Sequence, residues 1–182
     1  MQPTSIKSPL IFAALRDAGR FRPFDLVIGR YVACFQEDDV GFLRSAASLV
    51  KPGGTVASIE PAVAGTRGAS QPPVALYAKT WNWIDKGLQA GGVHVHMGNQ
   101  CVQWFVRAGL GEPTLLYEMA IGGPASSLVE WICLLLQSFV PALERAGLAK
   151  AEDFGFADLQ ARMQEAVTAA NSQIQAPPTV EA

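Results

Sequence analysis

The sequence has few cysteines and no net positive charge, and each of these features excludes a class of protein. The three cysteines are an odd number and lie far apart, without the spacing of metal ligands, at Cys34, Cys101 and Cys133. Free thiols of this kind are typical of a reducing cytosol, so we expect a cytoplasmic protein whose cysteines serve packing. The 14 basic and 16 acidic residues give a net charge of −2, which provides no basic stripe for nucleic acid.

Long apolar runs are missing as well. The run from Pro9 to Leu15 is closed by Arg16 and Asp17 too early for a signal peptide or a spanning helix, and the run that begins at Trp131 is also too short. No repeat or low-complexity segment interrupts the 182 residues, of which 49% are hydrophobic. That content is enough for a sizeable core, so we expect one domain over residues 1–182 and no membrane partner.

What the sequence does contain is a strand–helix–strand unit. An apolar run at Phe24 to Ile28 predicts a strand, and apolar residues between Val40 and Val50 recur with helical spacing. The turn at residues 51–54, Lys-Pro-Gly-Gly, ends the helix, and a second strand follows at Thr55 to Ile59. A connection that holds one helix joins parallel strands, so the unit predicts an α/β fold. Further helices are predicted at 74–90, at 98–108, from Pro124 onward and at 156–170.

The same segment resembles the central crossover of the class I S-adenosylmethionine-dependent methyltransferases. Its sequence, from Phe24 to Val63, is FDLVIGRYVACFQEDDVGFLRSAASLVKPGGTVASIEPAV. In that family an FDLV-type strand leads to a helix, then to PGG, then to a strand that ends in an acidic residue. The stretches TWNWIDKGLQAGG, MGNQCVQWFVRAGL and LERAGL also resemble the second half of one bacterial group of these enzymes. The resemblance covers residues 23–182 and implies a partial Rossmann-like methyltransferase fold, with a central βαβ unit, additional helices and a short mixed sheet.

Two features that the family uses to bind its cofactor are absent. Members carry a Gly-rich GxGxG turn after the first strand and an acidic residue after the second. Residues 1–22 contain one glycine, Gly19, and no strand followed by such a turn. By the resemblance, the chain begins at the family's fourth strand and ends near Thr179, where the last strand starts. We therefore expect a truncated domain with an atypical segment at 1–22, and weak or no binding of S-adenosylmethionine by the chain alone.

The best candidate site lies at the carboxyl ends of the two predicted strands, because ligands of open parallel sheets bind there. Gly29, Arg30 and Tyr31 follow the first strand. The resemblance implies that these three residues bind the cofactor, with Gly29 near its methionine part and Arg30 facing the methionine carboxylate. In the alternative interpretation, Arg30 pairs with Glu60 or Asp39.

Glu60 ends the second predicted strand and is the first catalytic candidate. Its carboxylate would orient a nucleophile or accept its proton; alternatively, it forms a hydrogen bond to the start of a neighbouring helix. His94 is the second catalytic candidate, as a general base on the substrate side. His94 and His96 place two imidazoles on one face of an extended segment, but no third ligand is evident, so we predict no metal; ordinary loop histidines are the remaining interpretation.

Three aromatic residues are the candidates for substrate binding. Tyr77, Trp81 and Trp83 would wall a pocket for an apolar or aromatic substrate. A stripe at helical spacing is equally typical of a core, and Tyr77 and Trp81 share such a stripe. Trp83 lies off the stripe.

The resemblance implies methyl transfer from S-adenosylmethionine to a small-molecule acceptor. Two alternatives belong to other classes of protein. A non-catalytic methyltransferase-like scaffold would use the open strand edge near Phe24–Ile28 for self-association or for a partner strand. A hydrolase or reductase of α/β class would need a nucleophile elbow or a dinucleotide fingerprint, and neither is found; a pocket that contains Ser58 with His94 would favour it.

Overall fold

The computed structural model of the chain describes residues 23–63 and 69–182, and the expected atypical segment at 1–22 lies outside them. The described residues form two compact units. Unit 1 contains the described residues up to Glu60, together with Met97–Leu116 and Val180–Ala182. Unit 2 contains Pro61–His96 and Tyr117–Thr179. The expectation of one domain over 1–182 stays a prediction.

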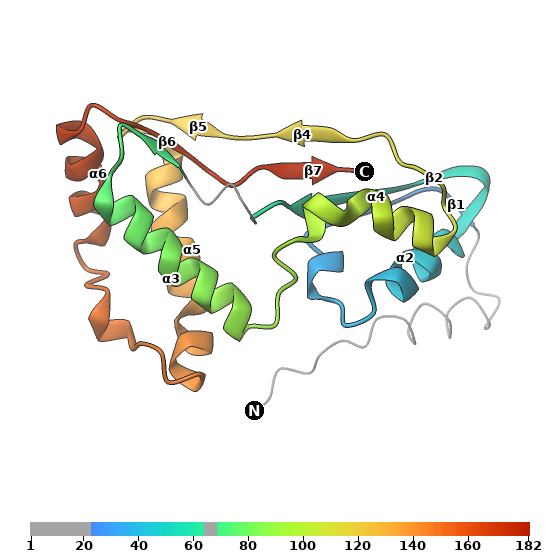
Figure 1. Cartoon of the computed structure of the whole chain (residues 1–182), viewed down its shortest axis with the longest axis horizontal. Helices are drawn as coiled ribbons and strands as arrows, with labels where there is room; N and C mark the ends of the chain where they lie inside the picture. Colours follow the sequence, from blue (N-terminus) through green and yellow to red (C-terminus); the bar gives the residue numbers. More distant parts are fainter. Residues whose placement is uncertain (1–22, 64–68) are drawn as a thin grey trace. The chain divides into compact units, whose positions relative to one another are not determined.

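Unit 1 contains the predicted crossover (Figure 1). Strands β1 (Phe24–Arg30) and β2 (Val50–Pro61) pair in parallel, and helix α2 (Asp39–Ala47) connects them. A 3-10 turn, η1 (Ala33–Phe35), lies between β1 and α2. The Asp38 carboxylate accepts a hydrogen bond from the backbone N–H of Gly41 at 2.8 Å, which caps the start of α2. The predicted parallel βαβ unit is therefore confirmed.

The boundaries of this unit differ from the predicted ones. Strand β1 runs two residues further, so Gly29 and Arg30 end the strand instead of following it. The predicted turn at 51–54 is instead the first part of β2. Helix α2 already ends at Ala47, and Gly53, with a φ of 81°, lets the extended chain bend. A side chain on Gly54 would place its Cβ 2.8 Å from the carbonyl oxygen of Asp25. Glycine at this position thus allows β1 and β2 to approach each other.

The last strand of the chain makes the larger sheet mixed. Strand β7 (Thr179–Glu181) lies between β2 and β4 (Leu116–Glu118), so the strand order is β1-β2-β7-β4. Ser58 and Ala182 exchange both of their backbone hydrogen bonds, at 2.8 and 2.9 Å, which is the pattern of an antiparallel pair. The expected short mixed sheet and the strand near Thr179 are confirmed.

The core of unit 1 lies between one face of the sheet and its helices. Helix α4 (Met97–Ala108) packs against α2, and both predicted helices are confirmed. Its buried side chains are apolar except for one thiol, and they recur with helical spacing: Met97, Cys101, Trp104 and Phe105. They join the buried residues Cys34, Val40, Leu43 and Ala46 from η1 and α2.

Unit 2 is mainly helical. Its helices are α3 (Ala75–Ala90), α5 (Ser127–Arg145) and α6 (Leu159–Ala169), with a 3-10 turn, η2 (Ala151–Asp153), before α6. A small antiparallel sheet joins β3 (Ser70–Gln71), β6 (Gln173–Gln175) and β5 (Ile121–Gly122) in the order β3-β6-β5. The sequence did not predict this sheet, since strands of two or three residues carry too little periodicity.

Helix α5 is long and apolar enough to cross a membrane by length and composition alone. Within unit 2, however, it packs against α3 and α6. A side chain on Gly87 of α3 would place its Cβ 2.5 Å from the Cβ of Phe139, so glycine allows the two helices to lie close together. The buried stripe of α5 consists of Val129, Ile132, Leu136, Val140 and Leu143. This packing is typical of the core helix of a globular unit.

Candidate functional site

The carboxyl ends of β1 and β2 lie side by side, since Arg30 is the neighbour of Ile59 in the parallel pair. Glu60 follows Ile59 and is fully buried. Its Oε1 accepts hydrogen bonds from the backbone N–H of Ala33 at 3.1 Å and from the Ser58 hydroxyl at 2.9 Å. Its Oε2 accepts from the backbone N–H of Cys34, also at 3.1 Å. One side chain therefore fixes the first turn of chain that leaves β1.

This geometry corresponds to the second interpretation of Glu60. The hydrogen bond to the start of a neighbouring helix is present, because Ala33 and Cys34 begin η1. Both carboxylate oxygens face donors of the protein itself, so the side chain acts as a support for the loop in this structure. A role for Glu60 as a catalytic base stays a prediction. The Ser58 hydroxyl, which the hydrolase alternative requires, is buried and donates to Glu60.

Glu60 also affects two buried thiols. Burial raises the pKa of Cys34, and the nearby Glu60 carboxylate raises it further. Burial raises the pKa of Cys101 to about 12, with a smaller contribution from Glu60. Both thiols therefore remain protonated near neutral pH, which makes them poor nucleophiles. This state fits the expected packing role of the cysteines.

The Gly29-Arg30-Tyr31 segment presents a cation and an aromatic ring to solvent. Tyr31 has a φ of 53°, in the left-handed region, and its backbone N–H donates to the carbonyl oxygen of Ile59 at 2.8 Å. The Arg30 guanidinium carbon lies 4.8 Å from the centroid of the Tyr31 ring, which is a cation–π contact. Burial raises the pKa of Tyr31, although Arg30 opposes the shift. Both residues are exposed, Tyr31 by 37%.

The structure also bears on the alternative interpretation of Arg30. In the described residues, Arg30 is not paired with Glu60 or Asp39. The Glu60 carboxylate accepts hydrogen bonds from backbone N–H groups of η1, and the Asp39 carboxylate accepts one from the backbone N–H of Val40 at 2.6 Å. The guanidinium is stacked on Tyr31 instead. A Cβ on Gly29 would meet only Val32, at an ordinary distance of 3.7 Å, so the neighbouring residues do not require glycine there.

The three aromatic candidates belong to unit 2. Tyr77 and Trp81 are buried and pack edge to face, with centroids 6.4 Å apart. The Tyr77 hydroxyl donates to the carbonyl oxygen of Gln175 at 2.7 Å, and burial raises its pKa to about 12. Trp83 is half-buried, with its ring edge-on to Phe154 at 5.6 Å and the Lys86 ammonium 4.2 Å from its centroid. Tyr77 and Trp81 thus lie in the core of unit 2, and substrate binding by the three residues stays a prediction.

His94 and His96 are exposed and lie in the turn that follows α3, at residues 91–96. The expectation of an extended segment is wrong, because the chain bends at Gly91 and Gly92 and then enters α4. The two imidazoles therefore do not lie on one face of a strand. Within residues 23–63 and 69–182, no group of three or more metal-binding side chains is found. Catalysis by His94 stays a prediction.

Sequence reasoning missed an open groove in unit 1. It has a volume of about 810 Å³ and follows the first half of β2, away from the carboxyl ends of the strands. Its lining is mostly apolar and comes from segments far apart in the sequence, such as Val56, Phe105 and Leu116. No local pattern in the sequence indicates such a groove, because it depends on the register of distant strands.

Comparison of the chain with protein-family models gives no match, and comparison with the curated proteins gives none. The family resemblance therefore rests on the residues quoted above, chiefly those from Phe24 to Val63. The structure adds the geometry of the strand ends.

Proposed function

We propose that the chain takes part in the transfer of a methyl group from S-adenosylmethionine to a small molecule, with a fold similar to the second half of a methyltransferase domain. The observation that carries the proposal is the parallel pair of strands whose carboxyl ends bring Gly29, Arg30 and Tyr31 beside Glu60. Ligands of open parallel sheets bind at such ends. The Rossmann-like fold of this family is part of the same proposal, supported by the βαβ unit within a mixed sheet.

The residues at the strand ends fit one end of the cofactor. Arg30 carries an exposed guanidinium, which binds a carboxylate through paired hydrogen bonds, and the ring of Tyr31 restrains it. Gly29 lies next to Arg30 near the end of β1, and by the resemblance it would lie near the methionine part of the cofactor. No described residue forms a Gly-rich turn for the nucleoside end. When bound, the cofactor supplies the activated methyl group.

The chain's own residues then have defined tasks. Arg30 binds and orients the carboxylate of the ligand, while Glu60 holds the loop from which Tyr31 projects. Alignment of this kind contributes to catalysis by removing freedom of motion before the reaction, and it needs no acid–base step. Side chains from other parts of the protein would complete the nucleoside pocket.

The test is binding of S-adenosylhomocysteine to the 182-residue chain by ligand-observed NMR, which detects weak complexes. We expect a weak, saturable signal that Arg30→Ala and Gly29→Val remove, while Arg145→Ala, an exposed arginine of α5, leaves it unchanged. No signal from the folded wild-type chain would contradict a cofactor site at this position. A signal that survives both Arg30→Ala and Gly29→Val would contradict it equally.

A second candidate function is a non-catalytic interaction module. One observation favours it: among residues 23–63 and 69–182, β1 is at the edge of the sheet, and its Leu26 and Ile28 are 52% and 58% exposed. Edge strands with exposed apolar residues pair readily with other chains. Association of the chain through β1 without any binding of S-adenosylhomocysteine would favour this function over methyl transfer.

A further inference from the structure

A polar network is buried near the carboxyl end of β2. Ser58 and Glu60 are two residues apart on this strand, so their side chains lie on the same face of the sheet. Both residues are buried. The Ser58 hydroxyl donates to Oε1 of Glu60 at 2.9 Å. This face of β2 therefore carries a hydroxyl and a carboxylate that are bonded to each other inside unit 1.

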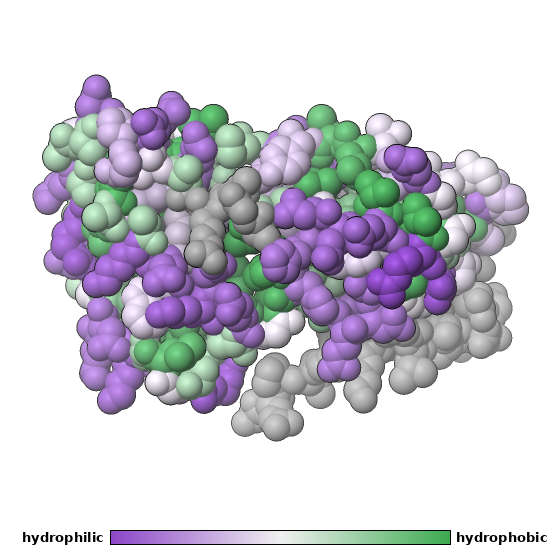
Figure 2. All heavy atoms as spheres, viewed as in Figure 1, coloured by the Kyte–Doolittle hydropathy of each residue, from purple (hydrophilic) through white to green (hydrophobic). Residues whose placement is uncertain are grey.

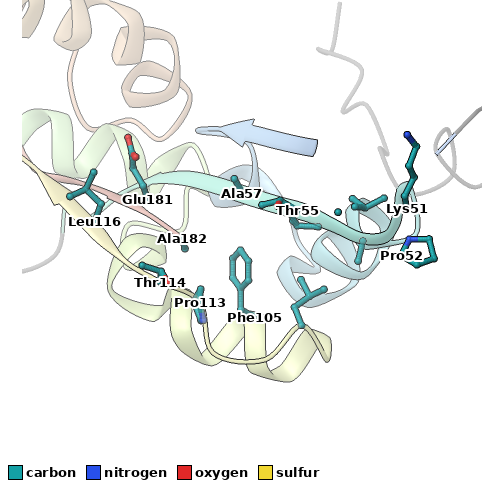
Figure 3. A pocket seen from close by; sticks show the side chains of 15 residues that line it. Lys51, Pro52, Thr55, Ala57, Phe105, Pro113, Thr114, Leu116, Glu181 and Ala182 are labelled. Atoms are coloured by element: carbon teal, nitrogen blue, oxygen red, sulfur yellow. The ribbon is translucent and has the colours of Figure 1, made fainter. Parts of the chain in front are cut away.

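Helix α4 covers the network. Burial and then the charge of Glu60 raise the pKa of Cys101 in α4, so the carboxylate lies near the inner side of this helix. Figure 3 shows the Phe105 ring of α4 directed toward β2. Figure 2 shows mostly hydrophilic surface where Figure 1 draws the outer side of α4. Because water has little access beneath the helix, the polar atoms of the network depend on each other for hydrogen bonds.

The backbone of Ser58 is held on both sides. Gly29 is its neighbour on β1, in the parallel pair. On the other side, Ser58 exchanges two backbone hydrogen bonds with Ala182, at 2.8 and 2.9 Å. The Ser58 hydroxyl therefore projects from a position that the sheet fixes.

Three donors set the orientation of the Glu60 carboxylate. Two are the backbone N–H groups of Ala33 and Cys34, one on each oxygen, and the third is the Ser58 hydroxyl. The two backbone donors belong to η1, which is the segment that the carboxylate holds. Ser58 belongs to the sheet, so its hydroxyl ties the carboxylate to the rigid part of unit 1.

The chain between β1 and η1 contains a strained residue. Tyr31 has a φ of 53°, in a region that residues other than glycine seldom occupy, and such a conformation persists where the surroundings fix it. The Tyr31 N–H donates to the carbonyl oxygen of Ile59, and Glu60 fixes Ala33 two residues later. The contact of Arg30 with the Tyr31 ring depends on this conformation.

We propose that Ser58 is a positioning residue for the ligand-binding pair Arg30 and Tyr31. Its hydroxyl fixes the Glu60 carboxylate, and the carboxylate fixes η1. The fixed η1 keeps Tyr31 in the backbone conformation in which its ring restrains the Arg30 guanidinium. The identity of the ligand rests on the proposed function, whereas the positions of Arg30 and Tyr31 are measurable without ligand.

Amide exchange of the free 182-residue chain, followed by NMR, tests the network. In Ser58→Ala the Glu60 carboxylate loses a donor, so exchange at Ala33 and Cys34 should accelerate by about tenfold or more. Exchange at Leu43, in the core of α2, should accelerate less, because the loss is local. Ser58→Thr keeps a hydroxyl on a side chain that suits a strand, and it should restore slow exchange.

The Arg30 side chain reports on the stack directly. The Tyr31 ring shifts the NMR signal of the Arg30 Nε–H group, because the guanidinium lies over the ring. In Ser58→Ala this signal should move toward its position in Tyr31→Ala. In Ser58→Thr it should stay at the wild-type position.

Ligand-observed NMR with S-adenosylhomocysteine measures the consequence for binding. Ser58→Ala should weaken binding by about three- to tenfold, and Ser58→Thr should bind like the wild type. Ser172→Ala is the matched control, since Ser172 is a buried serine of unit 2 whose hydroxyl donates to the carbonyl oxygen of Pro72 at 2.6 Å. It should leave both the binding and the exchange at Cys34 unchanged.

Equal exchange at Cys34 in the wild type and in Ser58→Ala would overturn the proposal, as would an unmoved Arg30 signal or a failure of Ser58→Thr to restore both. If Ser58→Ala does not fold, Ser58→Cys takes its place, because a thiol is a weak donor. Exchange as slow as in the wild type would then overturn the proposal. Faster exchange at Cys34 without any binding of S-adenosylhomocysteine by the wild type would contradict the proposed function and support the positioning role of Ser58.

Discussion

The Oε2 atom of Glu60 accepts the backbone N–H of Cys34 at 3.1 Å, although 26 residues separate them in the sequence. The Oε1 atom makes the same bond to Ala33. A single carboxylate at the end of β2 thus fixes the turn that leaves β1. Because Arg30 and Tyr31 immediately precede this turn, the position of the proposed ligand-binding groups depends on a side chain that has no contact with solvent.

Replacement of Glu60 by Gln should destabilise unit 1. One carboxylate oxygen becomes an amide N–H group, which faces a backbone donor and leaves it without an acceptor. An unsatisfied buried donor costs about 1–3 kcal/mol, so we expect the free energy of unfolding to fall by that amount in urea denaturation. Glu112→Gln, at an exposed carboxylate, should change it by no more than about 0.5 kcal/mol. Equal effects of the two substitutions would show that the Glu60 bonds do not support the fold.

The raised pKa values of the thiols predict slow alkylation. Cys34 and Cys101 should resist iodoacetamide at pH 8 in the folded chain and react in urea, as followed by mass spectrometry. Fast labelling of the folded protein at Cys34 or Cys101 would contradict this expectation.

The raised pKa of Cys101 also makes the stability of the fold depend on pH. The folded pKa of Cys101, about 12, exceeds the ordinary value of about 9, so the unfolded chain releases the proton first as the pH rises. The thiol's contribution is therefore complete below about pH 9 and is lost as the pH rises toward 12. Urea denaturation over this range should show a smaller alkaline loss in Cys101→Ala than in the wild type. The same loss in both proteins would show that Cys101 is not responsible.

Local patterns in the sequence predicted the crossover but not the contacts that shape the site. The apolar runs at Phe24–Ile28 and Thr55–Ile59 and the helical spacing between them were sufficient for the parallel pair. The bonds of Glu60 to η1 were only one of two interpretations, because their partners lie far along the chain. The stack of Arg30 on Tyr31 depends on a left-handed backbone at Tyr31, which no pattern indicates.

The aromatic candidates show a second limit of prediction from local sequence patterns. Helical spacing placed Tyr77 and Trp81 on one face of α3, and that face is buried in unit 2. Spacing alone cannot separate a core stripe from the wall of a pocket, since both need an apolar face. No pattern in the sequence indicated the groove beside β2, because its sides come together only through the register of β2, β7 and β4.

The exposed edge of β1 predicts self-association of the chain. In the part of the chain that the structure describes, Leu26 and Ile28 project from an edge strand, so sedimentation velocity should show a mass that rises with concentration. Leu26→Lys and Ile28→Lys should reduce this rise, because a charge on the edge opposes pairing. Leu134→Lys, at a residue of α5 that is 56% exposed, provides the matched control and should not change it. A stable monomer with slow exchange of the Leu26 amide would contradict the prediction.

The packing of α3 on α5 predicts that Gly87→Ala is destabilising, although alanine favours a helix by about 1 kcal/mol over glycine. The added Cβ would collide with Phe139, and overpacking of this kind costs about 1–3 kcal/mol. We therefore expect a net loss of unfolding free energy in urea denaturation. The nearest atom to the added Cβ is the Cβ of Phe139, at 2.5 Å, so Phe139→Gly should relieve the collision. The two substitutions together should therefore cost less than the sum of their separate effects. Additive costs, or a gain in stability for Gly87→Ala alone, would mean that α3 and α5 do not pack at this point.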